Sequence, residues 1–173
     1  LEQEIRLAMY PLREIVAQKA LHVALEIGPD VPRHLLGDAL RVRQVVRQLY
    51  DNAVKFTEHG KIVVGVRCLE RSAEYALLEV SVRDTGIGLD DEQKARIFNR
   101  FEQSDNSITR RYAGTGIGLA LAAKLVQFMG GEMSVESTPG LGSTFRFSLP
   151  VGFETQPVAT AAGGVDCETN GRR

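Results

Sequence analysis

Residues 43–57, Arg43-Gln-Val-Val-Arg-Gln-Leu-Tyr-Asp-Asn-Ala-Val-Lys-Phe-Thr57, predict an amphipathic helix with two different faces. The apolar residues recur at the three- and four-residue spacing of a helix and continue a stripe that begins at Val42. Asp38 is the expected N-cap, and His59-Gly60 is expected to close the helix after about Phe56. This is the longest helical pattern in the chain.

A second, polar stripe lies on the same helix. Gln48, Asn52 and Lys55 are spaced four and three positions apart, so they share a face. At about 100° per residue, this face borders the apolar one. Amide oxygens are hard ligands that suit Mg²⁺, and an ammonium group suits phosphate. The stripe therefore indicates either a metal–phosphate site or a polar rim without a ligand.

Shorter patterns flank this helix on both sides. A helical pattern from Leu1 to Ile15 contains Pro11, which should kink or divide it. The remaining elements are expected to be strands at 21–27, 61–69, 75–82, 132–137 and 143–149, and helices at 91–98 and 115–129. This order predicts an α+β fold, an α/β two-layer sandwich whose mixed, largely antiparallel sheet is covered on one face by helices. We expect one domain over residues 1–150 and a disordered tail or linker over 151–173.

The composition excludes several classes of protein. Lys and Arg number 21 against 22 Asp and Glu, which argues against a nucleic-acid-binding domain. No apolar run approaches the roughly 20 residues of a membrane span, and no secretion signal opens the chain. The two cysteines have no metal-ligand spacing and suit a reducing compartment. We therefore expect a cytoplasmic location, with neither nucleic acid nor direct membrane contact.

Nine of the 17 glycines lie between Gly86 and Gly142, and seven of these nine stand in three turns. Asp84-Thr-Gly-Ile-Gly88 follows a strand, where glycines allow close approach of a planar ligand and the carboxylate can accept a hydrogen bond. Gly114-Thr-Gly-Ile-Gly118 opens a helix, where backbone amides can bind an anion. Gly140-Leu-Gly-Ser-Thr144 is the third. Taken alone, the first turn also fits a glycine turn with a solvated Asp, and the third fits a hairpin connection. The second could open a dinucleotide-binding unit, although the strand that such a unit needs does not precede it.

The order and spacing of these segments resemble the catalytic, ATP-binding domain of sensor histidine kinases, in the wider group that includes gyrase, Hsp90 and MutL. The similarity covers roughly residues 1–150 and implies a Bergerat-type ATP-binding fold. The five matching motifs are the N box (43–57), the G1 box (84–89), the F box (97–104), the G2 box (114–121) and the third glycine box (140–145).

The resemblance assigns roles to individual residues. Asn52, with Gln48, would hold Mg²⁺ through a side-chain oxygen, and Lys55 would reach a phosphate. Phe56 would pack on the adenine, while Asp84 would accept a hydrogen bond from its amino group. Gly86 and Gly88 would leave room for the base, and Thr144 would help to hold it through water. The loop at 102–113 would be the ATP lid. The remaining nucleotide contacts would come from this lid and the G2 box: Arg110, Arg111, Gly114, Thr115, Gly116, Ile117, Gly118 and Leu119.

The resemblance also implies the reaction. Such a domain binds Mg-ATP, transfers the γ-phosphoryl group to a histidine on a separate dimerisation domain and leaves ADP. The downstream partner would be a response regulator or a receiver domain, since the sequence of residues 101–116 resembles that of hybrid kinases. His22, His34 and His59 stand in no phosphoacceptor motif, so we expect no autophosphorylation from this chain alone, which should be monomeric.

One departure from the family pattern leaves alternatives open. Gln48 stands where the N box usually has asparagine, which puts Mg²⁺ affinity and turnover in question but not the fold. One alternative is ATP hydrolysis in the same fold, for which Asp51 is the only acid in the N box and points about 100° away from Asn52. The other alternative is a catalytically weak module that binds nucleotide and acts through protein contacts.

Overall fold

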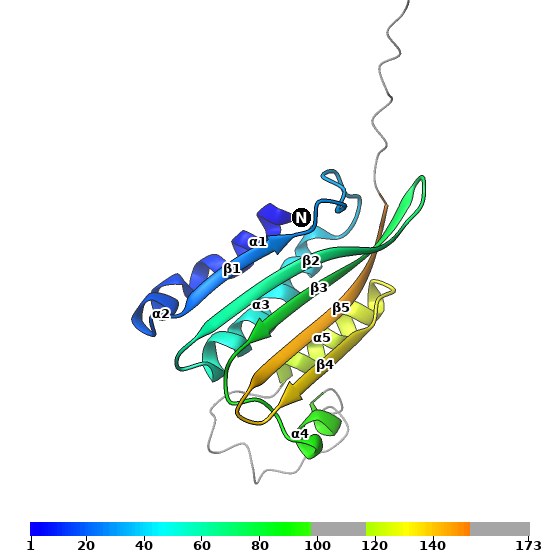
Figure 1. The fold of residues 1–173 in the computed structure, drawn as a ribbon. Coiled ribbons are helices and arrows are strands. Elements are labelled where there is room, and N and C mark those ends of the chain that lie inside the picture. The colour runs from blue at the N-terminus through cyan, green and yellow to red at the C-terminus, as the bar shows by residue number, and fades with distance from the viewer. Residues whose placement is uncertain (98–116, 153–173) are drawn as a thin grey trace, which may run out of the picture.

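The computed structural model describes residues 1–97 and 117–152. One sheet has the strand order β1-β2-β3-β5-β4, with β1 parallel to β2 and all other neighbours antiparallel (Figure 1). The elements are α1 (Glu2–Met9), η1 (Tyr10–Leu12), α2 (Arg13–Gln18), β1 (His22–Ile27), α3 (Ala39–Phe56), β2 (Lys61–Arg71), β3 (Tyr75–Asp84), α4 (Asp91–Arg96), α5 (Ile117–Phe128), β4 (Met133–Thr138) and β5 (Gly142–Gly152). The predicted two-layer α+β sandwich is confirmed.

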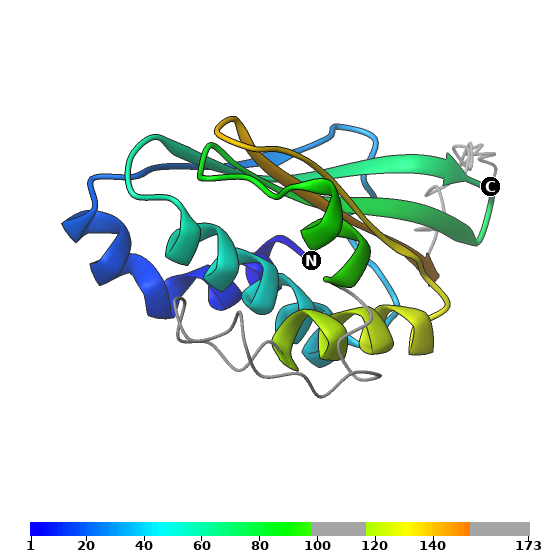
Figure 2. The ribbon, with the colours of Figure 1, turned by 90° about the horizontal axis from the view of Figure 1, so that it is seen from below.

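The helices lie on one side of the sheet, and the core lies between the two layers (Figure 2). Every second residue of β3, from Ala76 to Val82, is fully buried against them. The other face carries ion pairs between strands, Arg67–Glu79 at 2.8 Å and Arg146–Glu136 at 2.8 Å. This alternation is the period-2 pattern of a sheet with one covered face.

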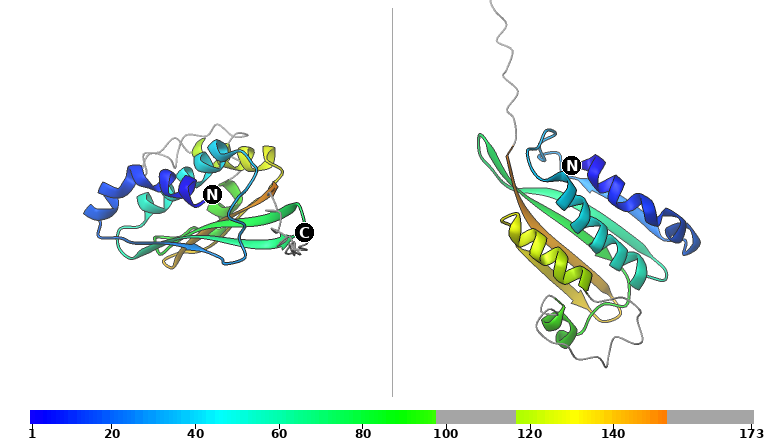
Figure 3. Two further views of the ribbon diagram at one scale, coloured as in Figure 1. Left: turned by 90° about the horizontal axis from the view of Figure 1, so that it is seen from above. Right: turned by 180° about the vertical axis from the view of Figure 1, so that it is seen from behind.

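The first helical pattern is divided at Pro11, as predicted. α1 ends at Met9, a 3-10 turn holds Pro11, and α2 begins at Arg13. Proline lacks the N–H that would continue the helical ladder. Viewed from behind the sheet, α1 and α2 run beside α3 (Figure 3).

The central helix α3 also follows its prediction. Asp38 caps it by accepting a hydrogen bond from the backbone N–H of Arg41 at 3.0 Å. The apolar stripe is buried, with Val45, Val46 and Leu49 fully enclosed. Because α3 packs on both α1 and α5, it forms the middle of the helical layer.

Some elements differ from prediction at their ends. β2 extends to Arg71 past a register shift between Cys68 and Glu70, and β5 extends to Gly152, which bridges to Leu36. Both extensions depend on pairing partners that are distant in sequence. The predicted lid at 102–113 lies outside the described residues. Over the described ranges, no helix is both long enough and apolar enough to cross a membrane.

Candidate functional site

The predicted site gathers around Asp84, at the end of β3. This carboxylate is only 6% exposed. It accepts hydrogen bonds from the backbone N–H of Gly86, at 2.8 Å, and from that of Ser143. Burial raises the pKa of Asp84 above its ordinary value, while the two N–H groups act in the opposite direction. A buried carboxylate at a strand end is thus held by backbone donors from two different motifs.

The glycines after Asp84 allow the loop to pack against its neighbours. A Cβ at Gly86 would overlap the carbonyl oxygen of Phe56, and one at Gly88, whose φ is +69°, would overlap that of Thr138. The Ile87 N–H donates to the Phe56 carbonyl at 3.3 Å, and the Gly140 N–H donates to the Ile87 carbonyl at 2.7 Å. The loop is therefore fixed between the end of α3 and the β4–β5 turn.

The polar stripe of α3 borders the core, as predicted: Gln48, Asn52 and Lys55 are all half-buried. Within the described residues, the Asn52 Nδ2 is buried and has no hydrogen-bond partner. A buried amide without a partner costs free energy, so such groups mark places where a ligand or water belongs. The Lys55 Nζ lies 5.1 Å from the centre of the Phe56 ring.

Gln48 faces the start of α5. A Cβ at Gly118 would overlap the amide carbon, nitrogen and oxygen of the Gln48 side chain. The structure thereby brings the N box and the end of the G2 box into contact. An asparagine at position 48 would be one methylene shorter, so the departure from the family pattern changes how this contact is made.

The third glycine box meets Asp84 through Ser143. Ser143 is 8% exposed and lies on the same sheet face as Phe145 and Phe147. Thr144 pairs with Arg83 and lies on the opposite face, so the structure does not bring its side chain to Asp84. Side chains alternate between the two faces of β5, so counting back by twos from Phe147 and Phe145 places Ser143 on the buried face. This alternation is the sequence signal that could have identified Ser143.

A pair of serines links this hairpin to the G1 loop and was missed by sequence reasoning. The Ser137 Oγ lies 2.9 Å from the Ser143 Oγ and accepts a hydrogen bond from the Leu89 N–H at 2.7 Å. The Lys94 ammonium also donates to the Ser137 carbonyl at 3.3 Å. These contacts hold the loop, the hairpin and α4 together.

Some predicted contacts cannot be placed. Five of them lie outside the described residues: Arg110, Arg111, Gly114, Thr115 and Gly116. Ile117 begins α5, and Leu119 packs against the core. Of the residues assigned to the nucleotide, the structure therefore gathers two groups, one around Asp84 and one along the polar stripe of α3.

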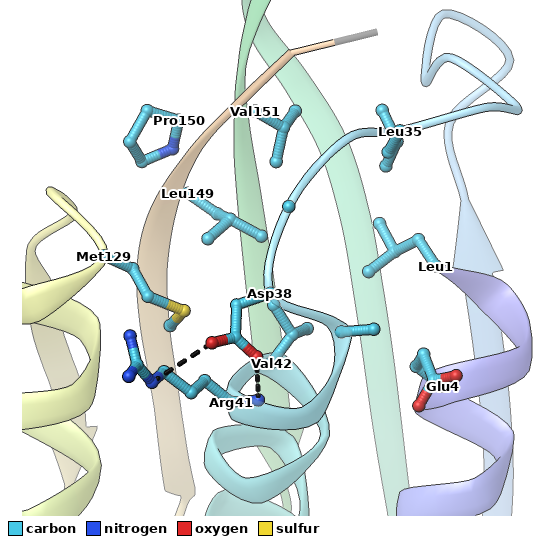
Figure 4. A pocket seen from close by; sticks show the side chains of 12 residues that line it. Leu1, Glu4, Leu35, Asp38, Arg41, Val42, Met129, Leu149, Pro150 and Val151 are labelled. Atoms are coloured by element: carbon cyan, nitrogen blue, oxygen red, sulfur yellow. Dashed lines mark hydrogen bonds and ion pairs between the residues drawn. The ribbon is translucent and has the colours of Figure 1, made fainter.

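A separate pocket of about 270 Å³ lies at the other end of α3 (Figure 4). Leu149, Pro150 and Val151 line it on the β5 side, and Asp38 and Arg41 on the side of α3. It contains none of the predicted site residues. Across the ranges 1–97 and 117–152, no three His, Cys, Asp or Glu side chains are grouped as a metal site. Amide oxygens are thus the metal-binding groups that the described stripe offers.

The comparisons with known proteins agree on one family. The model described as "Histidine kinase-, DNA gyrase B-, and HSP90-like ATPase" matches residues 37–152. Signal transduction histidine-protein kinase BarA of Escherichia coli (strain K12) is 45% identical over 131 residues, which make up 76% of this chain and 14% of BarA. Hybrid signal transduction histidine kinase F of Dictyostelium discoideum is 38% identical over 135 residues, 78% of this chain and 12% of that protein.

Solved structures agree with the sequence comparison. The crystal structure of full-length ShkA in complex with AMPPNP matches with a TM-score of 0.74 and 30% identity, over 91% of this chain and 31% of that one. The chain spans only a small part of the length of these relatives. By motif, fold and sequence, the chain belongs to the histidine kinase-, DNA gyrase B- and HSP90-like ATPase family, and the two sequence relatives named above are signal transduction histidine kinases, one of them a hybrid kinase.

Proposed function

We propose that this chain is the ATP-binding catalytic domain of a two-component sensor histidine kinase. In this proposal it binds Mg-ATP and passes the γ-phosphoryl group to a histidine on a separate dimerisation domain. The observation that carries the proposal is Asp84: a carboxylate 6% exposed, held by two backbone N–H groups and bordered by glycines.

An adenine ring fits the chemistry around Asp84. Its exocyclic amino group is a donor that a carboxylate accepts, whereas guanine presents a carbonyl oxygen there, which a carboxylate repels. Gly86 and Gly88 leave room for the carbonyl oxygens of Phe56 and Thr138, so these glycines fix the loop that carries Asp84. Phe56, half-buried at the end of α3, would supply an aromatic face for the base. The bound AMPPNP of the ShkA structure supports a nucleotide site in this fold.

The side-chain oxygens on the polar stripe of α3 are suitable ligands for magnesium. Mg²⁺ prefers oxygen ligands and is commonly held by one or two protein groups together with substrate phosphates. The side-chain oxygens of Asn52 and Gln48 are such ligands, whereas the unpartnered Asn52 Nδ2 is a hydrogen-bond donor and suits a phosphate oxygen rather than the metal. When bound, Mg²⁺ would neutralise phosphate charge. Gln48 would bind it from a position set by its contact with Gly118.

Phosphoryl transfer asks a protein mainly for positioning and for charge neutralisation. In this proposal Lys55, together with Arg110 and Arg111, binds the phosphates. The backbone N–H groups of Gly114, Gly116 and Gly118 would bind the phosphate oxygens at the start of α5. The acceptor histidine comes from a dimerisation domain, and a receiver domain or response regulator takes the phosphoryl group next, on the cytoplasmic side of the membrane.

The test is a calorimetric titration with ATP, with GTP, and with ATP in the absence of Mg²⁺. We expect binding of ATP that strengthens with Mg²⁺, and little binding of GTP. The second stage adds a purified histidine-containing dimerisation domain and ATP labelled at the γ-phosphate. Acid-labile label on the added domain supports the kinase. Release of free phosphate by the chain alone would favour hydrolysis, and the absence of ATP binding would contradict the proposal.

A further inference from the structure

The last turn of α3 carries Lys55 and Phe56 and follows directly after Asn52. The orientation of these side chains therefore depends on what holds this turn. The final carbonyl groups of a helix have no partner within the helix and must find one elsewhere. Their partners in this structure come from outside α3.

One side chain binds two of these carbonyls and that of the C-cap residue Thr57. The ammonium of Lys19 donates to the Val54 carbonyl at 2.9 Å, to the Thr57 carbonyl at 3.2 Å and to the Lys55 carbonyl at 3.3 Å. The Phe56 carbonyl between them accepts from the Ile87 N–H of the G1 loop. The end of α3 is thus held on one side by Lys19 and on the other by the loop that follows Asp84.

Lys19 is itself held in place. It is the C-cap of α2, where the Ala20 N–H bonds to the Ala17 carbonyl and the Leu21 N–H bonds to the Val16 carbonyl, a Schellman motif. Its side chain is 22% exposed. The ammonium also lies 3.2 Å from the carboxylate of Glu58, whose side chain is 72% exposed, so that this ion pair is weak.

The charge of Lys19 suits its position. The C-terminal end of a helix carries partial negative charge, and a cation placed there stabilises it. The half-buried ammonium exchanges water for three carbonyl oxygens, which satisfies both partners. A neutral side chain at position 19 would leave these carbonyls without their donor, beside the residues that are assigned to the nucleotide.

We propose that Lys19 is a positioning residue of the nucleotide site, which fixes the last turn of α3 so that Asn52, Lys55 and Phe56 keep the orientation that binds Mg-ATP. Lys19 does not touch the nucleotide in this arrangement. The inference rests on the proposed function for its ligand. The contacts of Lys19 on which it is based are all between described residues and do not depend on a bound ligand.

The experiment compares Lys19→Met with two controls. Glu58→Gln removes the ion pair but leaves the three carbonyl bonds, and Val151→Ala removes a methyl-bearing side chain from the core at the other end of the fold. Calorimetry with Mg-AMPPNP is performed below the melting temperature of every variant. We expect Lys19→Met to lose affinity by about tenfold, as for a site that loses a charged hydrogen-bonding group. Glu58→Gln and Val151→Ala should stay within about twofold of the original chain, although Val151→Ala also melts earlier.

A second readout does not depend on nucleotide. The side-chain amide signal of Asn52 in a ¹⁵N–¹H spectrum of the free chain should shift in Lys19→Met and stay in place in Val151→Ala. An unchanged Asn52 signal and unchanged affinity in folded Lys19→Met would overturn the proposal. If the original chain fails to bind Mg-AMPPNP, the proposed function is contradicted, and the Asn52 signal alone decides the role of Lys19. Should Lys19→Met not fold, Lys19→Gln replaces it with the same two expected results.

Discussion

At the scale of single residues, Asp84 shows two opposing effects on one carboxylate. Burial disfavours its charged form, and the N–H groups of Gly86 and Ser143 favour it, with the raised pKa showing that burial is the larger effect. The folded state therefore holds a proton on Asp84 at pH values where the unfolded chain has lost it. The free energy of unfolding due to this group falls as the pH rises from the unfolded pKa to the raised folded pKa. Above that interval, Asp84 lowers stability.

Asp84→Asn should separate binding from stability. The amide carries no charge to bury, so we expect a higher melting temperature at neutral pH and no fall in stability across the acidic interval described above. We also expect ATP affinity to fall by at least about tenfold, because a charged acceptor for the adenine amino group is lost. Thermal unfolding from acidic to neutral pH and calorimetry on the same samples measure both effects. Asp51→Asn, at an exposed position of α3, is the control and should change neither. A less stable Asp84→Asn variant with full affinity would contradict this account.

Gly118 and Gln48 should behave as a coupled pair. Gly118→Ala places a methyl group on the amide at the far end of the Gln48 side chain, which can move aside, and alanine also favours the helix, so we expect a loss of no more than about 1 kcal/mol in the free energy of unfolding. Shortening the side chain with Gln48→Asn should recover part of that loss, because the two residues touch. Denaturant unfolding of both single variants and the double variant gives the coupling energy. Strict additivity would show that the two side chains do not share this space.

At the scale of elements, the end of α2 stores a small amount of strain. Ala20 has a φ of +50°, the only positive value among the described non-glycine residues. The Schellman motif requires a left-handed residue at this position, where glycine has no Cβ to oppose it. The motif forms with alanine because α2 is anchored by the bonds of Lys19 to α3.

Ala20→Gly should therefore stabilise the domain. We expect the free energy of unfolding to rise by about 0.5–1 kcal/mol, since the left-handed conformation costs glycine little. Ala17→Gly, at an exposed position inside α2, is the matched control and should lower it by a similar amount. Chemical denaturation of the two variants is the measurement. Changes of the same sign in both would contradict the assignment of strain to Ala20.

At the scale of the whole molecule, the end of β5 closes the sheet against the segment before α3. The Leu36 N–H donates to the Gly152 carbonyl at 2.7 Å, and the Gly152 N–H donates to the Leu36 carbonyl at 3.2 Å. Val151 is 5% exposed beside them. The unit that folds together therefore includes Val151 and Gly152, and the family match also extends to residue 152.

Two shortened chains test this extent. A chain that ends at Gly152 should keep the melting temperature and the ATP affinity of the full sequence. A chain that ends at Pro150 loses a buried valine and the bridge to Leu36, and we expect it to be about 1–3 kcal/mol less stable. Thermal unfolding compares the three chains. Equal stability of both shortened chains would place the boundary at 150, as first expected from composition.

Much of the fold followed from local patterns. The spacing of apolar residues and the Asp38 cap were enough for α3, and Pro11 was enough to divide the first helix. The strands β2 and β3 were visible as two apolar runs joined by a short polar loop. These signals are local because helix and strand periodicity, caps and proline act within a few residues. The order of the glycine turns was sufficient to indicate the family.

The sequence by itself thus determined the elements, the family and the carboxylate at Asp84, whereas the tertiary structure decided which residues meet around them. That Ser143 rather than Thr144 faces Asp84 depends on strand register, and a shift of one residue would reverse it. The contacts of Gln48 with Gly118 and of Lys19 with the end of α3 join residues that are far apart in the chain. No local periodicity encodes such pairs, because they arise only when separate helices pack on a common sheet.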